Sequence, residues 1–417
     1  MPINNHRRDS HPYNHYRHRH YSQSSKSKKP WIFIIIILSL LAIVTYLYVQ
    51  PIGGVSPQYK ALTIPLPTKT AINWPANSQA AIGSVDDGLL TAKSNQVSKP
   101  TASTAKLVTA MTVLDKKPLQ LGQKGPTITL TQNDVDIYNQ YFAKDGSLAQ
   151  VKVGEQLTQY QLLQGMMLPS ANNYADTLAI WTFGSLEKYQ LAAQKYVNKL
   201  GLKNTTVGKD ASGFDPSTTS TAEDLTKLAV KAMKNKTLAE IVNQSQVDLP
   251  VAGVKDNTNW LLGADGVVGI KTGHTTEAGG VYVFASKYDY DKSHSAMIVG
   301  AVQGEPTVIN AIHESRPLIS QAKNNYKLSR VVKKGQIVAT YHSPWGKSIN
   351  AIAVNDVYVL QWKSKKIKPQ IELREIMTPT NKGTKAGTIT VGNISTDIIL
   401  QSSLTNPDWQ YRIFRYF

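Results

Sequence analysis

Residues 100–114 read PTASTAKLVTAMTVL and open a helical pattern on a Ser-x-x-Lys motif, Ser103 to Lys106. Residues three apart on a helix have Cβ atoms about 5–6 Å apart, so the Lys106 amine can reach the Ser103 hydroxyl. A serine becomes a useful nucleophile only when a base takes its proton, and burial or a nearby positive charge would lower the lysine pKa for that task. The stretch therefore predicts a nucleophile and its general base. Taken alone, the motif is more simply a capping serine beside a solvated lysine.

A second motif, Ser170-Ala171-Asn172, directly follows Pro169, where a helical pattern ends. A serine on such a turn can pass a proton to a leaving amine, and an asparagine can bind a substrate amide. Taken alone, these three residues are more simply an ordinary polar turn or a helix start.

A third motif, Lys271-Thr272-Gly273, follows Val267–Ile270, an apolar run typical of a buried strand. Lys271 and Thr272 would offer a positive charge and a hydroxyl to a terminal carboxylate. Gly273 has no side chain, so an extended substrate would be able to approach the strand edge closely. The competing interpretation is a strand that ends in a polar turn.

Single motifs of this kind are weak signals. Ser-x-x-Lys also occurs at residues 25–28 and 320–323, and Ser-x-Asn at residues 348–350, whereas Lys-Thr-Gly occurs once. In combination and in this order, however, the three motifs are the signature of serine β-lactamases and penicillin-binding proteins. The chain resembles the low-molecular-weight penicillin-binding proteins, the serine-type D-alanyl-D-alanine carboxypeptidases, over nearly all of residues 78–322. The matching stretches are residues 100–114, 163–179, 201–204, 220–229 (STAEDLTKLA) and 259–280 (NWLLGADGVVGIKTGHTTEAGG).

The resemblance implies a role for each motif residue. Ser103 would be the acylated nucleophile and Lys106 the general base, with Ser170 and Asn172 as the second element. Lys271, Thr272 and Gly273 would form the strand that binds the substrate carboxylate. The backbone N–H of His274 would join that of Ser103 in the oxyanion hole. The expected substrates are peptidoglycan stem peptides, β-lactams would be covalent inhibitors, and no metal or cofactor is expected.

Some positions depart from the family pattern. Asn173 stands where an aspartate is common, and Ala105 where a threonine is common. The family often has an arginine near the substrate carboxylate, but no arginine occurs between residues 281 and 315.

Two other functions compete with the carboxypeptidase. A class A β-lactamase would need a glutamate between the second and third motifs, in a Glu-x-x-Leu-Asn context that none of the glutamates there has (Glu187, Glu223 and Glu240). A catalytically silent scaffold that binds the wall through a basic C-terminal domain would leave the three intact motifs without a purpose.

Residues 31–50, WIFIIIILSLLAIVTYLYVQ, predict the compartment. Twenty helical residues span about 30 Å, the thickness of a bilayer hydrocarbon core. Seven Lys and Arg residues precede the run, so the N-terminus is expected inside and the rest outside. The run is longer than the apolar region of a cleavable signal peptide and ends in bulky residues. We expect an uncleaved single-pass anchor in the cell membrane with the catalytic domain on the extracellular side of a bacterium, a Gram-positive one being favoured.

Charge and composition exclude several other classes. The net charge of +18 is concentrated at the two ends: residues 1–30 carry +6, residues 51–325 only +3 and residues 326–417 carry +9. The near-neutral middle argues against nucleic-acid binding, while the basic end would be attracted to anionic lipid or wall polymers. The chain has no cysteine, which excludes disulfides and thiolate chemistry. Five of the nine histidines lie between His6 and His20 without regular ligand spacing, as in a disordered tail.

The 417 residues are enough for several domains. We expect a basic disordered tail (1–30), the membrane anchor (31–50), a flexible linker (51–77), a catalytic domain (78–322) and a small all-β domain (326–417). Strand signals at both ends of the catalytic domain, among them a hairpin at Asp86-Asp87-Gly88, flank helical patterns. One of these helices is expected to begin with a Ser220-x-x-Glu223 capping box. The fold class is therefore α+β, of the β-lactamase/transpeptidase type: an antiparallel sheet with helices on its faces.

Overall fold

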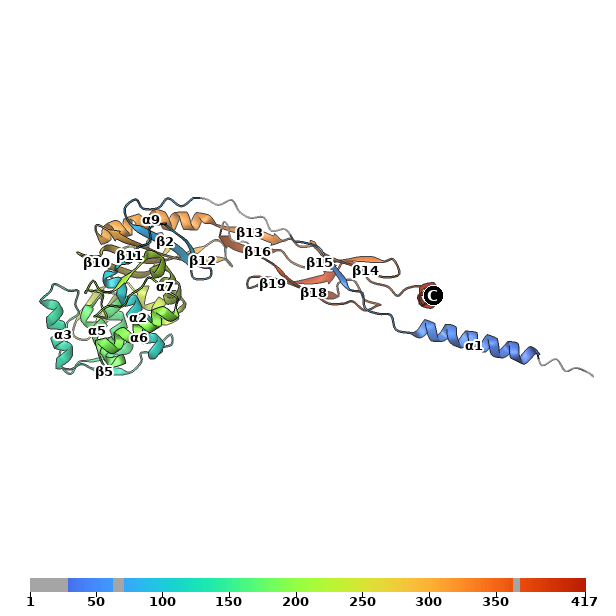
Figure 1. Cartoon of the computed structure of the whole chain (residues 1–417), viewed down its shortest axis with the longest axis horizontal. Helices are drawn as coiled ribbons and strands as arrows, with labels where there is room; N and C mark the ends of the chain where they lie inside the picture. The colour runs from blue at the N-terminus through green and yellow to red at the C-terminus, as the bar shows by residue number, and fades with distance from the viewer. Residues whose placement is uncertain (1–28, 63–70, 363–367) are drawn as a thin grey trace, which may run out of the picture.

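The computed structural model describes residues 29–62, 71–362 and 368–417. Figure 1 shows an elongated molecule, with the helix-rich domain at one end, a β-rich domain in the middle and the apolar helix α1 at the other end. The expected disordered tail and its histidine cluster fall almost entirely outside the described residues.

A five-stranded antiparallel sheet forms the centre of the helix-rich domain, with the strand order β10-β11-β12-β2-β3. Alternate residues along its strands pack on opposite faces, as the two-residue period of a strand requires. Val281, Val283 and Ala285 belong to one core cluster, while Tyr282 and Phe284 belong to another. The strands are β2 (Gln79–Ser84), β3 (Gly88–Ala92), β10 (Val267–Thr275), β11 (Gly279–Asp289) and β12 (Ser295–Glu305).

Helices cover both faces of this sheet (Figure 1), which confirms the predicted α+β class. One face packs against α9 (Val308–Asn325), which contributes Leu318 and Ile319 to the core. The other face packs against a larger helical region that includes α2 and α7. Its helices are α2 (Lys106–Lys116), α3 (Gln132–Phe142), α4 (Gln159–Met167), α5 (Asn172–Phe183), α6 (Leu186–Lys199), α7 (Ala222–Lys234) and α8 (Lys236–Val242).

Local sequence explains where these elements begin and end. The turn Asp86-Asp87-Gly88 joins β2 to β3 with Gly88 at a φ of +77°, so the predicted hairpin is confirmed. The capping box predicted for α7 is wrong by one residue. Thr221 is the N-cap and its hydroxyl accepts from the N–H of Asp224, whereas the Ser220 hydroxyl bonds to Thr205.

Short elements complete this domain. They are β4 (Lys99–Pro100), β5 (Thr127–Thr129), β6 (Gln156–Thr158), β7 (Thr219–Ser220), β8 (Gln246–Leu249), β9 (Gly253–Asp256) and the 3₁₀ turns η1 (Ala102–Ala105) and η2 (Ala264–Gly266).

The C-terminal domain is built on a six-stranded sheet, ordered β1-β14-β15-β19-β18-β17, with a two-stranded sheet of β13 and β16. Its core is a separate cluster that includes Val338, Tyr341 and Ile398. The elements are β13 (Tyr326–Val332), β14 (Ile337–His342), β15 (Ser348–Ala353), β16 (Val357–Trp362), β17 (Gln370–Leu373), β18 (Lys385–Val391), β19 (Ile394–Leu400) and the short helix α10 (Trp409–Phe414).

The segment expected to be a flexible linker, residues 51–77, is where the structure differs most from the sequence-based expectation. Residues Pro57–Tyr59 form β1, which pairs with β14 at the edge of the C-terminal sheet. Val55 is buried in that domain's core and exchanges two backbone hydrogen bonds with Ile376. The first part of the segment is therefore structured, because an edge strand offers unpaired backbone groups and Val55 gains a buried site.

The apolar run forms a single helix, α1 (Lys29–Val49). Within the part of the chain that the structure describes, it is the one helix long and apolar enough to cross a membrane. Its residues from Pro30 to Val49 are not buried against the rest of the protein.

Candidate active site

Ser103 and Lys106 lie where the 3₁₀ turn η1 meets helix α2. The Lys106 Nζ donates to the Ser103 Oγ at 2.8 Å, so the spacing of the motif does bring the two groups together. The preceding residue, Ala102, has a φ of +45°, a conformation that costs free energy for a residue with a Cβ. Gly213 packs on this turn so closely that a Cβ there would lie 2.1 Å from the Ala102 oxygen. The backbone next to Ser103 is therefore strained at Ala102 and tightly packed against Gly213.

Lys106 is completely buried and is surrounded by acceptors. Besides Ser103, its amine contacts the Asn172 Oδ1 at 2.7 Å and the Ser212 carbonyl oxygen at 3.1 Å. Burial lowers the pKa of Lys106 to about 7, against the opposing effect of the negative charges of Asp210 and Asp176. A large share of this amine is therefore neutral at physiological pH and able to accept the serine proton.

The second motif lies in the turn between α4 and α5. Asn172 is the first residue of α5, and its side-chain amide oxygen points at the amine of Lys106. Ser170 is 5% exposed and has a φ of +67°, so this turn is also backbone-strained. Its hydroxyl makes no hydrogen bond to Ser103 or to Lys106. The structure thus joins Asn172 to the first motif and places Ser170 nearby in sequence without a direct contact.

The third motif lies within strand β10, not after it. Gly273 packs directly on the turn that carries the serine, because a Cβ added there would be 3.0 Å from the Ser103 backbone nitrogen. Glycine therefore lets the strand approach the nucleophile's own backbone closely, whereas a larger residue would have to displace the turn by a few tenths of an ångström. The next residue, His274, has an exposed side chain.

Lys271 and Thr272 are both buried on β10. The Lys271 amine donates to the Thr272 carbonyl oxygen at 3.1 Å, and the Thr272 hydroxyl bonds to that of Thr258 at 2.8 Å. Within the described ranges no carboxylate forms an ion pair with Lys271. Burial, followed by the positive charge of Lys106, lowers the pKa of Lys271 well below its usual value. A substrate carboxylate would supply the missing counter-charge.

A polar network behind Lys106 was missed by the sequence analysis. The Tyr141 hydroxyl donates to the Asp176 Oδ2 at 2.7 Å, and the Asp176 Oδ1 accepts from the Ala211 N–H at 2.9 Å. Asp210 accepts from the Ser212 hydroxyl at 3.1 Å and from the Gly213 N–H at 2.8 Å. These contacts fix the loop whose carbonyl oxygen meets Lys106. One signal was available, since Asp176 is a lone charge four residues after Asn172 on an apolar helix.

The same network places two carboxylates close to the amine. Burial, and then the charge of Asp210, raise the pKa of Asp176 to about 7. Burial and the two carboxylates also raise the pKa of Tyr141, so that its hydroxyl stays protonated and donates. The negative charge near Lys106 therefore changes in the same pH range as Lys106 itself.

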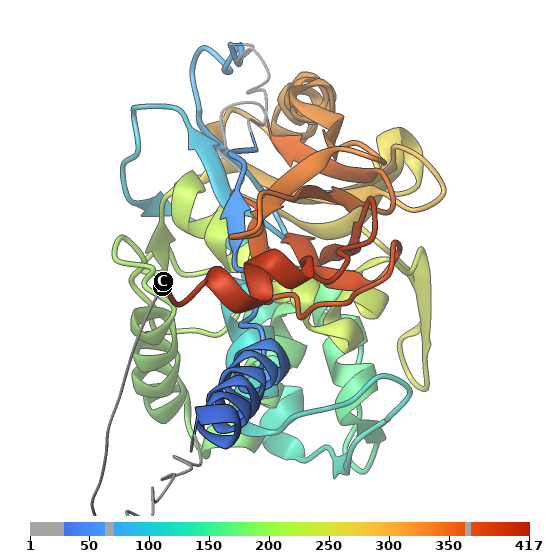
Figure 2. The same ribbon diagram turned by 90° about the vertical axis from the view of Figure 1, so that its right-hand side faces the viewer.

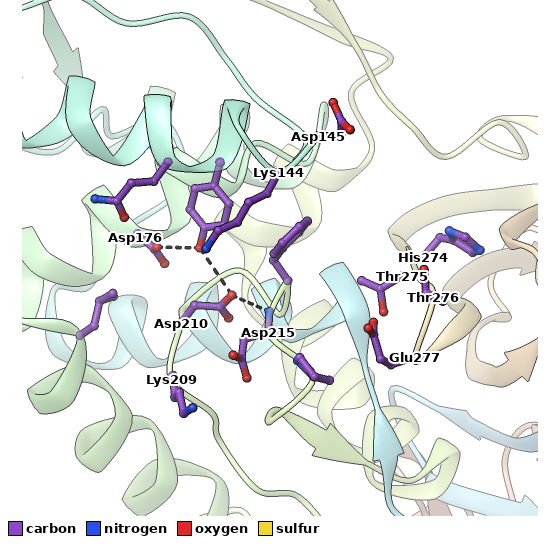
Figure 3. A pocket seen from close by; sticks show the side chains of 15 residues that line it. Lys144, Asp145, Asp176, Lys209, Asp210, Asp215, His274, Thr275, Thr276 and Glu277 are labelled. Carbon is purple, nitrogen blue, oxygen red and sulfur yellow. Dashed lines mark hydrogen bonds between the residues drawn. The ribbon is translucent and has the colours of Figure 1, made fainter.

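A cavity of about 610 Å³ opens beside these groups (Figure 3). Asp176 and Asp210 lie on one side, and the end of β10 with its following turn, including His274 and Glu277, lies on the other. Ser103 is not among the residues that line this cavity. Within the described residues no cluster of three or more histidine or carboxylate side chains is arranged to hold a metal ion.

A family model described as D-alanyl-D-alanine carboxypeptidase matches residues 68–302, more than half of the chain. The chain belongs to the D-alanyl-D-alanine carboxypeptidase family. This is a family of serine hydrolases, and the resemblance expected from the three motifs is confirmed.

Curated members of the family are similar over the same region. The D-alanyl-D-alanine carboxypeptidase of Streptomyces sp. (strain K15) is 31% identical over 211 residues, which are 46% of this chain and 70% of that protein. The D-alanyl-D-alanine carboxypeptidase DacB2 of Mycobacterium tuberculosis is 28% identical over 275 residues, 62% of this chain and 82% of that protein. For DacF of Bacillus subtilis the match covers 64% of the relative.

Solved structures of other proteins share the fold of this chain. The peptidoglycan synthesis regulatory factor PBP3 of Streptococcus pneumoniae has a TM-score of 0.58 at 16% identity, over 79% of this chain and 99% of that one. The Streptomyces K15 enzyme, described there as a DD-transpeptidase, has a TM-score of 0.53 at 25% identity, over 60% of this chain and 98% of that one. The match to the Streptococcus pneumoniae protein covers more of this chain than the catalytic domain alone, so it extends into the C-terminal domain.

Proposed function

We propose that this protein is a membrane-anchored D-alanyl-D-alanine carboxypeptidase that removes the terminal D-alanine from peptidoglycan stem pentapeptides through an acyl-enzyme on Ser103. The contact between Ser103 and Lys106 carries the proposal. A serine hydroxyl 2.8 Å from a buried lysine with a pKa of about 7 is a nucleophile paired with a base matched to neutral pH.

Acylation uses the groups of all three motifs. Lys106 takes the Ser103 proton as the oxygen attacks the carbonyl carbon of the penultimate D-alanine. The N–H groups of Ser103 and His274 stabilise the oxyanion. As the C–N bond breaks, the proton from Lys106 reaches the leaving amine of D-alanine by way of the Ser170 hydroxyl.

Deacylation returns the enzyme to its starting state. Water attacks the ester carbonyl carbon, gives one proton to Lys106, and the C–O bond to Ser103 breaks as that proton returns to the serine oxygen. No glutamate of the class A β-lactamase type serves this step. Glu240 accepts from Tyr160, Glu223 is paired with Lys227, and Glu187 lies at the exposed start of α6.

Lys271 and Thr272 recognise the substrate carboxylate. The family's arginine is absent from residues 281–315, and the first arginine after that interval, Arg316, is bound to Asp265 at 2.7 Å. The buried lysine therefore provides the main positive charge for the carboxylate at this site.

Helix α1 holds the enzyme in the membrane, with the catalytic domain on the outside. The length and apolar composition of α1 support this placement, together with the seven basic residues that precede it. The cell-wall substrate lies on that side of the membrane.

The test is D-alanine release from a stem pentapeptide by the full chain in detergent. The wild type should release one D-alanine per peptide, and Ser103→Ala should release none and take up no fluorescent penicillin. Ser320→Ala is the matched control, because Ser320 is an exposed serine in a second Ser-x-x-Lys motif on α9. A Ser103→Ala protein that still releases D-alanine would disprove the assignment.

An amine acceptor added to the same assay separates hydrolysis from transpeptidation. The carboxypeptidase proposal predicts that free tetrapeptide remains the main product in the presence of a glycine-terminated acceptor. Predominant transfer to the acceptor would make the enzyme a transpeptidase that uses the same Ser103 chemistry.

A further inference from the structure

Thr258 connects the second and third motifs of the active site. It lies between β9 and η2, and its backbone N–H donates to the Leu168 carbonyl oxygen at 3.0 Å. Leu168 ends α4, two residues before Ser170. The Thr258 hydroxyl lies 2.8 Å from the Thr272 hydroxyl on β10 and 3.3 Å from the Leu168 carbonyl oxygen. Thr258 thus contacts both the turn that carries Ser170 and the strand that carries Lys271.

Both neighbours of Thr258 are held in place by hydrogen bonds. The Asn257 side-chain amide donates to the Gln244 carbonyl oxygen at 2.8 Å. The Asn259 side chain is buried, and its Oδ1 accepts from the Tyr282 hydroxyl at 2.9 Å. The segment between β9 and η2 is therefore fixed on each side of Thr258, so its hydroxyl has a defined position next to Thr272.

Thr272 and Lys271 reach the edge of the sheet from different faces. Strand β10 pairs Thr272 with Tyr282 and Lys271 with Val283, so the two side chains point to opposite faces of the strand. Strand β10 is also an outer strand of the five-stranded sheet. A substrate carboxylate at this edge can therefore meet the amine from one face and the hydroxyl from the other.

The two hydroxyls can share their hydrogens in two ways, because each hydroxyl has one hydrogen to donate. If the Thr258 hydroxyl donates to the Leu168 carbonyl oxygen, the Thr272 hydroxyl donates to Thr258 and has no hydrogen left for a ligand. If the Thr258 hydroxyl donates to Thr272 instead, the Thr272 hydrogen is free to bind a carboxylate oxygen. The Leu168 carbonyl oxygen keeps the Thr258 N–H as its partner in both arrangements. The second arrangement is the one that an anion at the strand edge favours.

We propose that Thr258 is a positioning residue for substrate recognition, whose hydroxyl donates to Thr272 and thereby directs the Thr272 hydrogen at the substrate carboxylate. The proposal rests on the proposed function, in which Lys271 and Thr272 bind that carboxylate. Hydrogen bonds in a chain polarise one another, so the donation from Thr258 also strengthens the bond that Thr272 makes. This support is useful in a chain without an arginine between residues 281 and 315. Thr258 itself does not touch the substrate.

The site is remote from the membrane helix. Figure 1 shows the sheet that contains β10 at the opposite end of the molecule from α1, and in Figure 2 α1 (blue) lies in front of the catalytic domain. Detergent that covers α1 therefore leaves the neighbourhood of Thr258 free, and the full chain can be used for the test.

Two substrates that differ only in the carboxylate test the proposal. Acylation rates of the full chain are measured with benzylpenicillin and with its methyl ester, and their ratio gives the preference for the free carboxylate. Thr258→Val removes the hydroxyl at nearly constant volume, and Thr258→Ser keeps it. Thr237→Val is the matched control, because Thr237 is a buried threonine on α8 whose hydroxyl also donates to a distant carbonyl oxygen, that of Leu119 at 2.8 Å.

We expect Thr258→Val to react about 2- to 12-fold more slowly with benzylpenicillin, the effect of one neutral hydrogen bond, and at an unchanged rate with the ester. Thr258→Ser and Thr237→Val should keep the carboxylate preference of the wild type. If Thr258→Val slows both substrates equally, Thr258 has a structural role only and the proposal is wrong.

A double-mutant cycle tests whether Thr258 acts through Thr272. Thr272→Val should also lower the carboxylate preference, and adding Thr258→Val to it should cause no further loss. Losses that multiply in the double variant would show that Thr258 acts independently of Thr272, which contradicts the proposal. The proposed function fails separately, if the wild type releases no D-alanine from a stem pentapeptide.

Discussion

The amine of Lys106 lies 2.7 Å from the amide oxygen of Asn172, although the two residues are 66 positions apart in the chain. The first begins α2 and the second begins α5, so two helix starts converge on one buried amine. An amide oxygen accepts a hydrogen bond without adding a full negative charge. It thus orients the amine while leaving its pKa low enough for the amine to act as a base.

Two substitutions of Asn172 distinguish its orienting effect on the Lys106 amine from the effect of a charge placed beside that amine. Asn172→Ala should slow penicillin acylation by about 10- to 150-fold, since a hydrogen bond to a charged or reacting group contributes about 1.5–3 kcal/mol. Asn172→Asp should place a carboxylate against Lys106, raise its pKa, and move the acylation pH profile to higher pH. Asn173→Ala is the control, because Asn173 bonds to the backbone of Ala149 and not to Lys106. Identical pH profiles for Asn172→Asp and the wild type would contradict the contact.

The pH dependence of acylation should report the titration of Lys106. The amine is a base only when deprotonated, and its pKa is lowered to about 7. The acylation rate should therefore increase as the pH rises through about 7 and level off above it. Stopped-flow measurement with a fluorescent penicillin gives this profile. A rate that is constant from pH 6 to pH 8 would remove Lys106 as the base.

Asp176 should shift that profile. Its negative charge raises the pKa of Lys106, so Asp176→Asn should move the midpoint to lower pH, while the asparagine oxygen still accepts from the Ala211 N–H. Asp115→Asn is a suitable control, because Asp115 is an exposed aspartate on the same helix as Lys106. If the midpoint pH of acylation is unchanged in Asp176→Asn but moves in Asp115→Asn, Asp176 is not the charge that raises the pKa of Lys106.

The sequence predicted the parts of this site that depend on short spacing. Ser103 lies in the 3₁₀ turn η1 and Lys106, three residues later, begins α2, so their contact follows from local geometry alone. The fold class and the hairpin before β3 were likewise accessible from alternating and helical patterns. The network of Tyr141, Asp176 and Asp210 was not, because it joins three segments that meet only through tertiary packing.

The segment after α1 shows structure that its local sequence did not predict. Residues 51–62 contain two prolines and two glycines and show little periodicity, so their sequence resembles a linker. Their structure is imposed by a partner that the local pattern does not reveal, the free edge of strand β14. The reason for Gly273 was hidden in the same way, since its close neighbour is the Ser103 backbone 170 residues earlier.

Lys271 should discriminate substrates by their carboxylate. Lys271→Ala should lower acylation by a D-alanyl-D-alanine peptide by about 10- to 150-fold, the loss expected of a charge-assisted contact worth roughly 1.5–3 kcal/mol. A peptide with an amidated C-terminus should react slowly with both proteins, so the preference for the free carboxylate should disappear in the variant. Lys287→Ala is the control, because Lys287 is an exposed lysine on the neighbouring strand β11. An undiminished carboxylate preference in Lys271→Ala would assign recognition to another group.

Val55 tests whether the segment after the membrane helix belongs to the C-terminal domain. Its side chain is 3% exposed within that domain's core, so Val55→Ala should destabilise the pairing of β1 with β14 by about 1–3 kcal/mol. Hydrogen exchange of the full chain measures this, since the β14 amides near Val338 should exchange faster while those of β11 remain protected. Val97→Ala, at a valine that is 59% exposed, should change neither region. Unchanged exchange in β14 would mean that residues 51–62 act as a free tether, and the catalytic domain would then sample a range of heights above the membrane.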